Sequence, residues 1–516
     1  MSRLAAVVLS SGLALALLGA VVPAQADPAQ ADPMQAEPST PATSEQSGAT
    51  TTSAGDRRTT PPQLRRQGRW MVDPQGRVVI VHGLNLVYKH APYVPPADDF
   101  GFGERDADWF REHGFNAARL GTLWTGLTPD APGVVDPAYV ARWQRIIDLL
   151  AEREIWMQFD FHQDMWHETY GGEGAPDWAM KRPLPFSLTP YLPVPFPMGY
   201  WTPEVSTVFD RFWAGKDGLL DGWVKAWEVA AREWRDQPYS MGYDLMNEPW
   251  AGLEWAECLL TGCPRTYTHE LQPAFTKALK AIRRIDPSNL VWWEPQQFAG
   301  GQPLDTFFTA VPGEENLGFS WHSYCPDVFL ESQGVPASNV ENCWEFARGR
   351  QRHALEQGEE MQAATMMSEW GATDNIRAIE IDAAVADEHL MGWTHWAYKR
   401  WNDPTTADGN QGLFTDDADP TTVKQDKLRT LVRTYAQRTA GIPETMRFDT
   451  GNGDFEFVYR PDPSITAPTE IFVSPLHYPE GWEVTVDNGR VVGNGSRLVR
   501  VRADGTGPVS VRIARR

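Results

Sequence analysis

Eight short apolar runs, separated by longer stretches, most constrain how this chain can fold. The runs are residues 78–86, 117–124, 155–163, 241–249, 290–295, 317–324, 365–371 and 392–400. The stretches between them include residues 136–154 and 266–287, and in the first of these Trp143 and Ile147 recur at helical spacing. Near-continuous apolar strands that alternate with helices are typical of a parallel sheet. Eight such units predict an α/β fold, a closed (β/α)₈ TIM barrel, over residues 61–440.

The sequence changes in character after the predicted barrel. The segments FEFVYRPD, TEIFVSP and WEVTVDNG alternate apolar with polar residues, and Gly, Pro and Asn-Gly turns separate them. This pattern predicts a small antiparallel β-sandwich domain over residues 441–516, after a last helix at roughly 421–439. We expect the sandwich to cap the barrel, with carbohydrate binding or membrane docking as the alternative.

The first 26 residues have the features of an export signal. They contain Arg3, an apolar stretch, and the small residues Ala24 and Ala26, which fit an A-x-A cleavage site. An uncleaved membrane anchor is the alternative, because the apolar run at residues 4–22 approaches the length that spans a bilayer. Residues 27–60 have almost no aromatic or branched apolar side chains, which predicts a disordered linker. We therefore expect a secreted protein.

The cysteines indicate the redox compartment of the protein, and its net charge limits the classes of partner that it can bind. Four cysteines suit an oxidising destination and allow three disulfide pairings. We expect nearest-neighbour bridges, Cys258–Cys263 and Cys325–Cys343. A formal charge of −22 without a basic run argues against nucleic acid as a partner. The acidic surface also disfavours anionic bilayers, so transient contact with a membrane or micelle would use apolar patches. We expect a monomer.

Two of the predicted strands end in a glutamate that suits hydrolysis. Glu248 lies in YDLMNEPW at the end of the fourth run, and Glu369 lies in TMMSEWG at the end of the seventh. These strands lie across a barrel from one another, at the end where such barrels carry their sites. Retaining glycosidases use two carboxyl groups about 5–5.5 Å apart. The proximity of Glu369 would keep Glu248 protonated as the acid, whereas Glu369 stays ionised and attacks. Glu294, in VWWEP, is expected to be too poorly placed to partner Glu248.

Several motifs together resemble the retaining barrel enzymes of glycoside hydrolase family 5. They are the N-E-P on the fourth strand, the glutamate on the seventh, the H-x-Y of WHSY and the tryptophan of THWAYK. The run DFHQDMW and the NLVYK near the first strand are similar to the endoglycoceramidases of this family. The resemblance covers about residues 62–516. It implies hydrolysis of the bond between the oligosaccharide and the ceramide of glycosphingolipids, with no cofactor and no metal.

The resemblance also implies roles for the residues around the two glutamates. Glu248 would be the acid/base and Glu369 the nucleophile, which would form a covalent glycosyl-enzyme. Asn247 would bond the 2-hydroxyl of the sugar under attack. Tyr324 would donate a hydrogen bond to Glu369, and Arg119 matches a basic residue near the nucleophile.

Further residues are implied to bind the substrate. His162, Asp164 and Lys89 would bind sugar hydroxyls, Trp396 would stack on a sugar ring, and His322 would contact the substrate. Three of these residues have a simpler interpretation. Both histidines would be satisfied core residues, and Lys89 would be a solvated loop lysine. The acidic residues around His162 suggest a metal site by residue type, but no second spaced cluster of ligands accompanies them.

A long insertion at residues 175–201 favours a lipid substrate over a polysaccharide. Its apolar residues are Trp178, Met180, Leu184, Phe186, Leu192, Val194, Phe196, Met198, Tyr200 and Trp201. Burying an acyl chain there would gain about 0.8 kcal/mol per methylene. The alternatives are an insertion that packs on itself, a family 5 endo-β-glucanase or other polysaccharide hydrolase, and a binding module with inert carboxylates.

Overall fold

The computed structural model describes residues 61–180, 196–332, 339–406 and 411–516. The expected export signal and linker lie outside these residues, as does the central part of the apolar insertion, 181–195. Within the described part of the chain, every helix is too short or too polar to cross a membrane.

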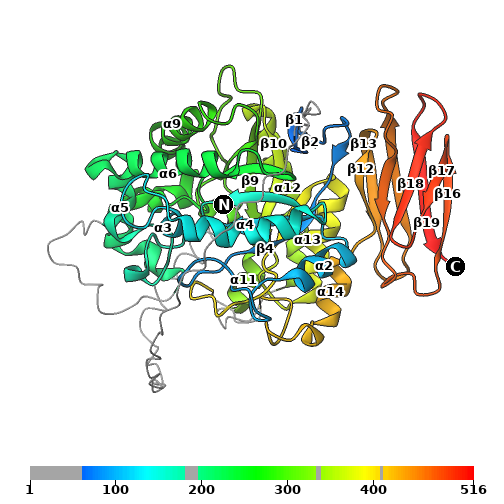
Figure 1. Cartoon of the computed structure of the whole chain (residues 1–516), viewed down its shortest axis with the longest axis horizontal. Helices are drawn as coiled ribbons and strands as arrows, with labels where there is room; N and C mark the ends of the chain where they lie inside the picture. Colours follow the sequence, from blue (N-terminus) through cyan, green and yellow to red (C-terminus); the bar gives the residue numbers. More distant parts are fainter. Residues whose placement is uncertain (1–60, 181–195, 333–338, 407–410) are drawn as a thin grey trace, which may run out of the picture. The chain divides into compact units, whose positions relative to one another are not determined.

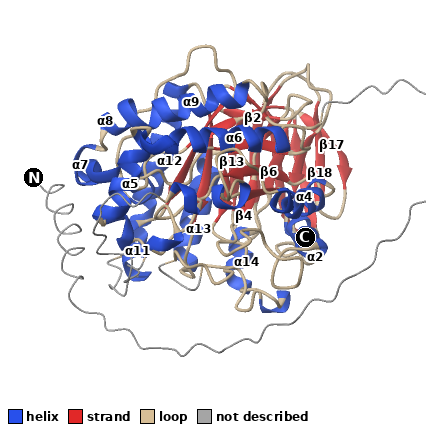
Figure 2. Ribbon diagram, turned by 60° about the vertical axis from the view of Figure 1, so that its left-hand side comes forward, coloured by secondary structure: helices blue, strands red, loops and turns tan. Residues whose placement is uncertain are grey.

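Eight parallel strands form the closed barrel that the sequence predicts. They are β4 His82–Leu86, β5 Ala117–Gly121, β6 Trp156–Asp160, β7 Ser240–Asp244, β8 Val291–Trp293, β9 Leu317–Ser323, β10 Ala364–Trp370 and β11 Gly392–His395. Their order is β4 to β11 around the barrel, and β11 closes it by pairing with β4 through Trp393 and His82. Nearly all of their residues are buried on both faces, as expected for a parallel sheet under helices. Figure 2 shows the strands enclosed by helices.

The helices follow the strands in alternation. They are α2 Glu104–His113, α3 Trp124–Leu127, α4 Pro137–Ala151, α5 Pro203–Trp213, α6 Leu219–Trp234, α7 Trp255–Thr261, α8 Pro264–Thr266, α9 Gln272–Arg283, α10 Phe298–Gly301, α11 Pro326–Ser332, α12 Cys343–Met361, α13 Ile376–His389 and α14 Gln425–Leu431. The predicted helix at 136–154 is α4, whose N-cap Asp136 accepts from Ala138 N and whose first residue is a proline. The predicted helix at 266–287 is interrupted: a π-helical turn, Tyr267–Leu271, precedes α9.

The remaining strands form two antiparallel sheets (Figure 1). The sequence predicts a sandwich within residues 441–516, but one of the sheets also contains strands from residues 65–79 and 435–439. One sheet contains β1 Arg65–Gln67, β2 Trp70–Val72, β3 Val78–Val79, β12 Tyr435–Thr439, β15 Thr469–Phe472, β17 Gly489–Asn494 and β18 Leu498–Ala503. The other contains β13 Gly441–Phe448, β14 Phe455–Pro461, β16 Trp482–Asp487 and β19 Val509–Arg515. Along β14 the rings of Phe455, Phe457 and Tyr459 are buried and stack in succession, which explains the period of two in this sequence.

Two predicted elements are wrong in detail. The run at 78–86 is two strands, because Ile80 N donates to Gln437 in the sandwich whereas the next carbonyl, of Val81, accepts from Trp393 in the barrel. The last helix ends at Leu431, and the remainder of the predicted segment becomes β12. In both cases pairing with distant strands overrides the local pattern.

The sandwich contacts the barrel at the C-terminal ends of α2 and α13, shortly before β5 and β11 begin. Tyr435 Oη donates to Gly114 O over 2.7 Å, and Arg433 forms a buried ion pair with Asp387 at 2.6 Å. Gly114 has φ 78°, and a Cβ there would lie 2.3 Å from the ring of Phe472. The sandwich therefore packs against the end of the barrel opposite to the strand ends that carry the two glutamates.

Candidate active site

The barrel brings Glu248 and Glu369 together. Glu248 follows β7, and Glu369 is the next-to-last residue of β10. One oxygen of each carboxyl group and a ring nitrogen of His322 all lie within 4.8 Å of one another. Glu248 has φ 41°, in the left-handed region that residues with a side chain rarely adopt, so the fold holds this residue in a strained backbone conformation.

The surroundings of Glu248 favour its protonated form. His322 Nδ1 lies 2.8 Å from Oε1, and Gln297 Nε2 donates to Oε2 over 3.2 Å. Burial raises the pKa of Glu248, and the charge of Glu369 raises it too, whereas His322 lowers it; the net result is a raised pKa. A carboxyl group in this setting can deliver a proton at a pH where an exposed glutamate has lost it.

Two hydrogen-bond donors hold the carboxylate of Glu369. Arg119 Nη1 donates to Oε1 over 2.5 Å, and Tyr324 Oη donates to Oε2 over 2.9 Å. Burial raises the pKa of Tyr324 well above its usual value and Glu369 raises it further, so the hydroxyl remains a donor. Glu369 itself is 5% exposed. A carboxylate that is fixed at both oxygens keeps one orientation, which favours attack on the anomeric carbon of a bound sugar.

Arg119 is the centre of a buried polar cluster beneath the two glutamates. Besides Glu369, its guanidinium contacts Asn85, Asp160, Asp244, Asn247 and Glu294 at 2.7 to 3.2 Å. Burial lowers the pKa of Arg119, but the four surrounding acids outweigh burial and raise it well above its usual value. The predicted Arg119 and Asn247 therefore lie in the site, the amide oxygen of Asn247 accepting from the guanidinium.

Glu294, which was expected to be too poorly placed to act as the partner of Glu248, lies within the polar cluster of the site. Its Oε2 accepts from the backbone N–H of Glu248 over 2.9 Å, and its Oε1 accepts from Arg119 over 2.7 Å. The sequence did contain a signal for Glu294: like Glu248, it ends an apolar run and is followed by a proline. Sequence reasoning did not identify Asn85 and Asp244, because nothing near them in the chain marks them as partners of Arg119.

His322 lies between three carboxyl groups. Its Nδ1 is 2.8 Å from Glu248 and 3.6 Å from Glu369, and its Nε2 is 3.4 Å from Glu294. Burial lowers the pKa of His322, but Glu294 and Glu369 outweigh burial and raise it well above its usual value. The raised pKa favours the imidazolium form, whose charge would compensate that of the acids around it.

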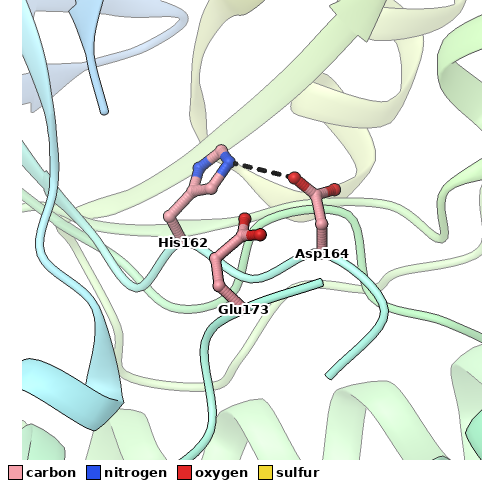
Figure 3. Close-up of side chains that lie close together, drawn as sticks. All are labelled: His162, Asp164 and Glu173. Atoms are coloured by element: carbon pink, nitrogen blue, oxygen red, sulfur yellow. Dashed lines mark ion pairs between the residues drawn. The ribbon is translucent and has the colours of Figure 1, made fainter. Parts of the chain in front are cut away.

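Four residues predicted to bind sugar form a second cluster. Lys89 Nζ lies 2.7 Å from Asp164 Oδ2 and 4.7 Å from the ring centroid of Trp396. The ring of His162 stacks on Trp396 with a centroid distance of 5.3 Å, and its Nε2 is 3.6 Å from Asp164 (Figure 3). Lys89 is 4% exposed, so the alternative of a solvated loop lysine is wrong. A flat indole beside charged hydrogen-bonding groups is an arrangement that can bind a sugar ring and its hydroxyls.

Sequence reasoning missed the residues that support this second cluster. Thr405 Oγ1 lies 2.6 Å from Lys89 Nζ, and Asp403 lies 3.3 Å from it. Gln411 accepts from the indole N–H of Trp396 over 2.8 Å and donates to Asp403 over 3.0 Å. All three lie in the polar segment after β11, in which neither a motif nor a period distinguishes them.

The described ends of the apolar insertion pack on the barrel. Trp178 lies edge-on against Trp124, and its indole N–H donates to Thr128 O over 3.0 Å. Tyr200 is fully buried, and its hydroxyl donates to Asp164 over 3.3 Å. Two exposed leucines, Leu253 and Leu260, follow β7 on the same end of the barrel.

The two disulfides are the predicted nearest-neighbour pairs. Cys258–Cys263 joins α7 to α8, and Cys325–Cys343 joins the segment after β9 to the start of α12. Both follow barrel strands that lead into the site, and the second begins one residue after Tyr324.

Two family models match the chain. Residues 103–402 match the model "Cellulase (glycosyl hydrolase family 5)", which is more than half of the chain. Residues 433–513 match the model "Glycoside hydrolase family 5 C-terminal domain".

Known relatives match over nearly the same length. The chain is 35% identical to "Endoglycoceramidase I" of Rhodococcus hoagii (strain 103S) over 463 residues, which cover 88% of each protein. Two solved structures of endo-glycoceramidase II from Rhodococcus sp. are also similar. The lactosyl-enzyme intermediate has a TM-score of 0.69 and 26% identity, covering 87% of this chain and 99% of the other. The complex with ganglioside GM3 has a TM-score of 0.72 and 25% identity, covering 87% of this chain and 100% of the other.

Proposed function

The chain belongs to glycoside hydrolase family 5, and we propose that it is a retaining endo-β-glycosidase that hydrolyses the bond between the oligosaccharide and the ceramide of glycosphingolipids. The observation that carries the proposal is the pairing of Glu248 and Glu369: one carboxyl oxygen of the first lies within 4.8 Å of one carboxyl oxygen of the second. Retaining enzymes use carboxyl groups about 5–5.5 Å apart, whereas inverting enzymes need about 6.5–9.5 Å to admit a water. The relatives named endoglycoceramidases, and the one solved with a ganglioside, support the substrate.

The first step breaks the bond to ceramide. Glu369, held by Arg119 and Tyr324, attacks the anomeric carbon of the sugar next to ceramide. Glu248 gives its proton to the departing ceramide oxygen, so ceramide leaves as a neutral alcohol. The product is a glycosyl ester on Glu369.

The second step releases the glycan. Glu248, now ionised, takes a proton from a water that attacks the anomeric carbon from the side that ceramide has left. The Glu369 ester breaks, and the glycan leaves with its original β configuration. His322, a cation 2.8 Å from Glu248, stabilises the carboxylate that exists between the two steps.

The second cluster binds the sugar. Lys89, His162 and Asp164 form hydrogen bonds with hydroxyl groups, and Trp396 stacks on a ring face. Asn247 bonds the 2-hydroxyl group of the sugar under attack, a contact that strengthens as the ring becomes positive.

Apolar residues at the same end of the barrel accommodate the lipid. Leu253 and Leu260 are 55% and 75% exposed, and the described ends of the insertion add the partly exposed Trp178 and Trp201. Transient contact with a membrane or micelle uses these side chains rather than charge, because the protein has a net charge of −22. The two disulfides and the leader-like first 26 residues support secretion, and the enzyme acts as a monomer.

A polysaccharide hydrolase is the second candidate, since the matching family model carries the name cellulase. The test is mass spectrometry of the products from a mixed glycosphingolipid pool and, separately, from cellulose and mannan, each with and without detergent. We expect free ceramide and uncut glycans from the lipids, and no products from the polymers. Cleavage of a polymer with the lipids untouched, or stepwise removal of single sugars, would overturn the proposal. Proton NMR of the first glycan released distinguishes retention from inversion.

A further inference from the structure

Glu173, which follows two glycines in the sequence GGEG, lies against the sugar-binding cluster. Its backbone N–H donates to Asp164 O over 2.8 Å, and Asp164 N donates back to Glu173 O over 3.1 Å. A Cβ on Gly172 would lie 1.8 Å from Asp164 O, and one on Gly174, which has φ 126°, would lie 2.4 Å from Gln163 Cβ. Glycine on both sides therefore allows this segment to approach the end of β6 closely and fixes the position of the Glu173 side chain.

The carboxyl group of Glu173 is buried without a hydrogen-bond donor. Glu173 is 0% exposed, and neither of its oxygens has a hydrogen-bond partner among the described residues. Figure 3 shows the group directed toward His162 and Asp164, and one of its oxygens lies within 4.8 Å of a ligand atom on each. One of its oxygens lies 3.6 Å from the ammonium of Lys89, but buried carboxylates normally accept hydrogen bonds as well, so this one requires an explanation.

The charges around Lys89 supply the explanation. Three carboxyl groups face its ammonium: Asp164 at 2.7 Å, Asp403 at 3.3 Å and Glu173 at 3.6 Å. Lys89 gives its hydrogen bonds to Asp164 and Thr405, so Glu173 is the most distant acid and receives none. Three ionised acids outnumber Lys89, and a protonated His162 would not restore the balance, because its Nδ1 is paired with a further acid, Asp160, at 2.8 Å. The excess negative charge would lie in a dry place, which is costly. A proton on Glu173 removes that excess and converts an acceptor without a partner into a donor.

Asp164 is the acceptor that such a proton would face. Its Oδ2 accepts from Lys89 and Thr405, while among the described residues its Oδ1 receives only the long bond of 3.3 Å from Tyr200. Burial raises the pKa of Glu173, Lys89 opposes this, and Asp164 and Asp403 raise it further; the net pKa is well above the usual value. Burial alone would raise the pKa of Asp164 too, but Lys89 and His162 outweigh it and lower the pKa.

We propose that Glu173 is a neutral carboxylic acid that positions Asp164 by donating a hydrogen bond to it, and so sets the Asp164–Lys89 pair that binds sugar hydroxyls. Glu173 is a positioning residue, because it acts through Asp164 and does not touch the sugar. The assignment of sugar binding to this pair depends on the proposed function, whereas the protonation of Glu173 does not.

Two variants test whether Glu173 is a neutral acid or an ionised one that serves as a third counter-ion of Lys89. Glu173→Gln keeps the shape and a donor but carries no charge, and we expect its KM and kcat to stay within about threefold of the parent at pH 5 to 6. Glu173→Leu removes the donor, and we expect at least a tenfold rise in KM with kcat within about threefold. At higher pH, where Glu173 of the parent ionises, the KM of the parent should rise while that of Glu173→Gln stays constant. Loss of activity in Glu173→Gln equal to that in Glu173→Leu, or a normal KM in Glu173→Leu, would overturn the proposal.

An infrared measurement tests the protonation without any substrate. The difference spectrum between the parent and Glu173→Gln, both at pH 6 and both folded by circular dichroism, should contain the C=O band of a protonated carboxylic acid. Glu257→Gln, an exposed change on α7, is the matched control and should give no such band. A carboxylate band in its place would contradict the proposal even if Glu173→Leu does not fold. If glycolipids are not hydrolysed at all, the proposed function fails while this measurement still decides the state of Glu173.

Discussion

Arg119 donates a hydrogen bond to Glu369 over 2.5 Å, although the two residues are 250 positions apart in the chain. The same guanidinium also contacts three further acids, so it offsets the charge of the whole acidic layer beneath the site. Glu369 is therefore coupled to the interior of the barrel, and we expect both activity and stability to depend on the Arg119 side chain.

Substitution of the guanidinium should affect both properties. Arg119→Lys keeps one charge but cannot form the several hydrogen bonds of the planar group. We expect kcat/KM to fall at least about 100-fold, and the free energy of unfolding to fall by about 3–5 kcal/mol because buried acids lose their partner. Urea denaturation and initial rates measure the two effects. Arg348→Lys, at an exposed ion pair with Glu388, should change neither.

Removal of the proposed nucleophile should abolish turnover without loss of the fold. Glu369→Gln cannot form the glycosyl ester, and we expect kcat to fall by at least about 10³-fold. Glycolipid hydrolysis followed by mass spectrometry measures this, with Glu360→Gln, exposed on α12, as the control. Turnover within tenfold of the parent would rule out Glu369 as the nucleophile.

The acid role of Glu248 should appear in the pH profile. Its pKa is raised, so the protonated form required for the first step persists to higher pH than for an exposed glutamate, and kcat/KM should fall as pH rises through that pKa. In Glu248→Gln the fall of kcat/KM at high pH should disappear, and kcat/KM on glycolipids should be about 10²- to 10⁴-fold lower than in the parent. Aryl glycosides with acidic leaving groups should be affected much less, because their departure needs no proton. Equal losses on both kinds of substrate would contradict the assignment.

Two buried histidines should affect stability with opposite pH dependence. The folded-state pKa of His322 is raised, so its contribution is complete below about pH 6.5 and is lost as pH rises through the folded pKa. Burial lowers the pKa of His477 to about 4, so its contribution increases from about pH 4 to 6.5 and then levels off. Urea midpoints of His322→Gln and His477→Gln relative to the parent, measured from pH 4 to 9, should diverge in these directions. Parallel curves for the two variants would show that the assigned shifts are wrong.

The disulfides should differ in their contribution to stability. Chain entropy predicts about 3 kcal/mol for the bridge with a sequence separation of 18, Cys325–Cys343, and about 2 kcal/mol for the one with a separation of 5, Cys258–Cys263. Double replacement by serine at each pair, followed by denaturant unfolding, measures both. Because Cys325 follows Tyr324, removing the longer bridge should also lower kcat. Full activity and stability of the double serine variant would show that this bridge does not constrain Tyr324.

The barrel could be predicted because its signal is local. Each strand is a run of apolar residues of the right length, and the polar residue that ends it marks the catalytic end, so Glu248 and Glu369 were identifiable. Strand boundaries near the sandwich were not, since Val81 and Ile80 differ only in the distant strands with which they pair.

The partners within the site could not be predicted in the same way. Asn85 lies on β4, Asp244 on β7, and Glu294 directly after β8, so their contact with Arg119 exists only when the barrel closes. Glu173 could not be interpreted from the sequence either, since the raised pKa of its carboxyl group depends in part on Asp403, which is 230 residues further along the chain.

The sequence by itself determined the architecture and the two glutamates, because hydrophobic periodicity and strand ends are properties of neighbouring residues. Only the tertiary structure decided which acids carry protons and which cation each one faces. Charge compensation in a buried site depends on distances of a few ångströms between residues far apart in the chain, and burial sets its energetic weight.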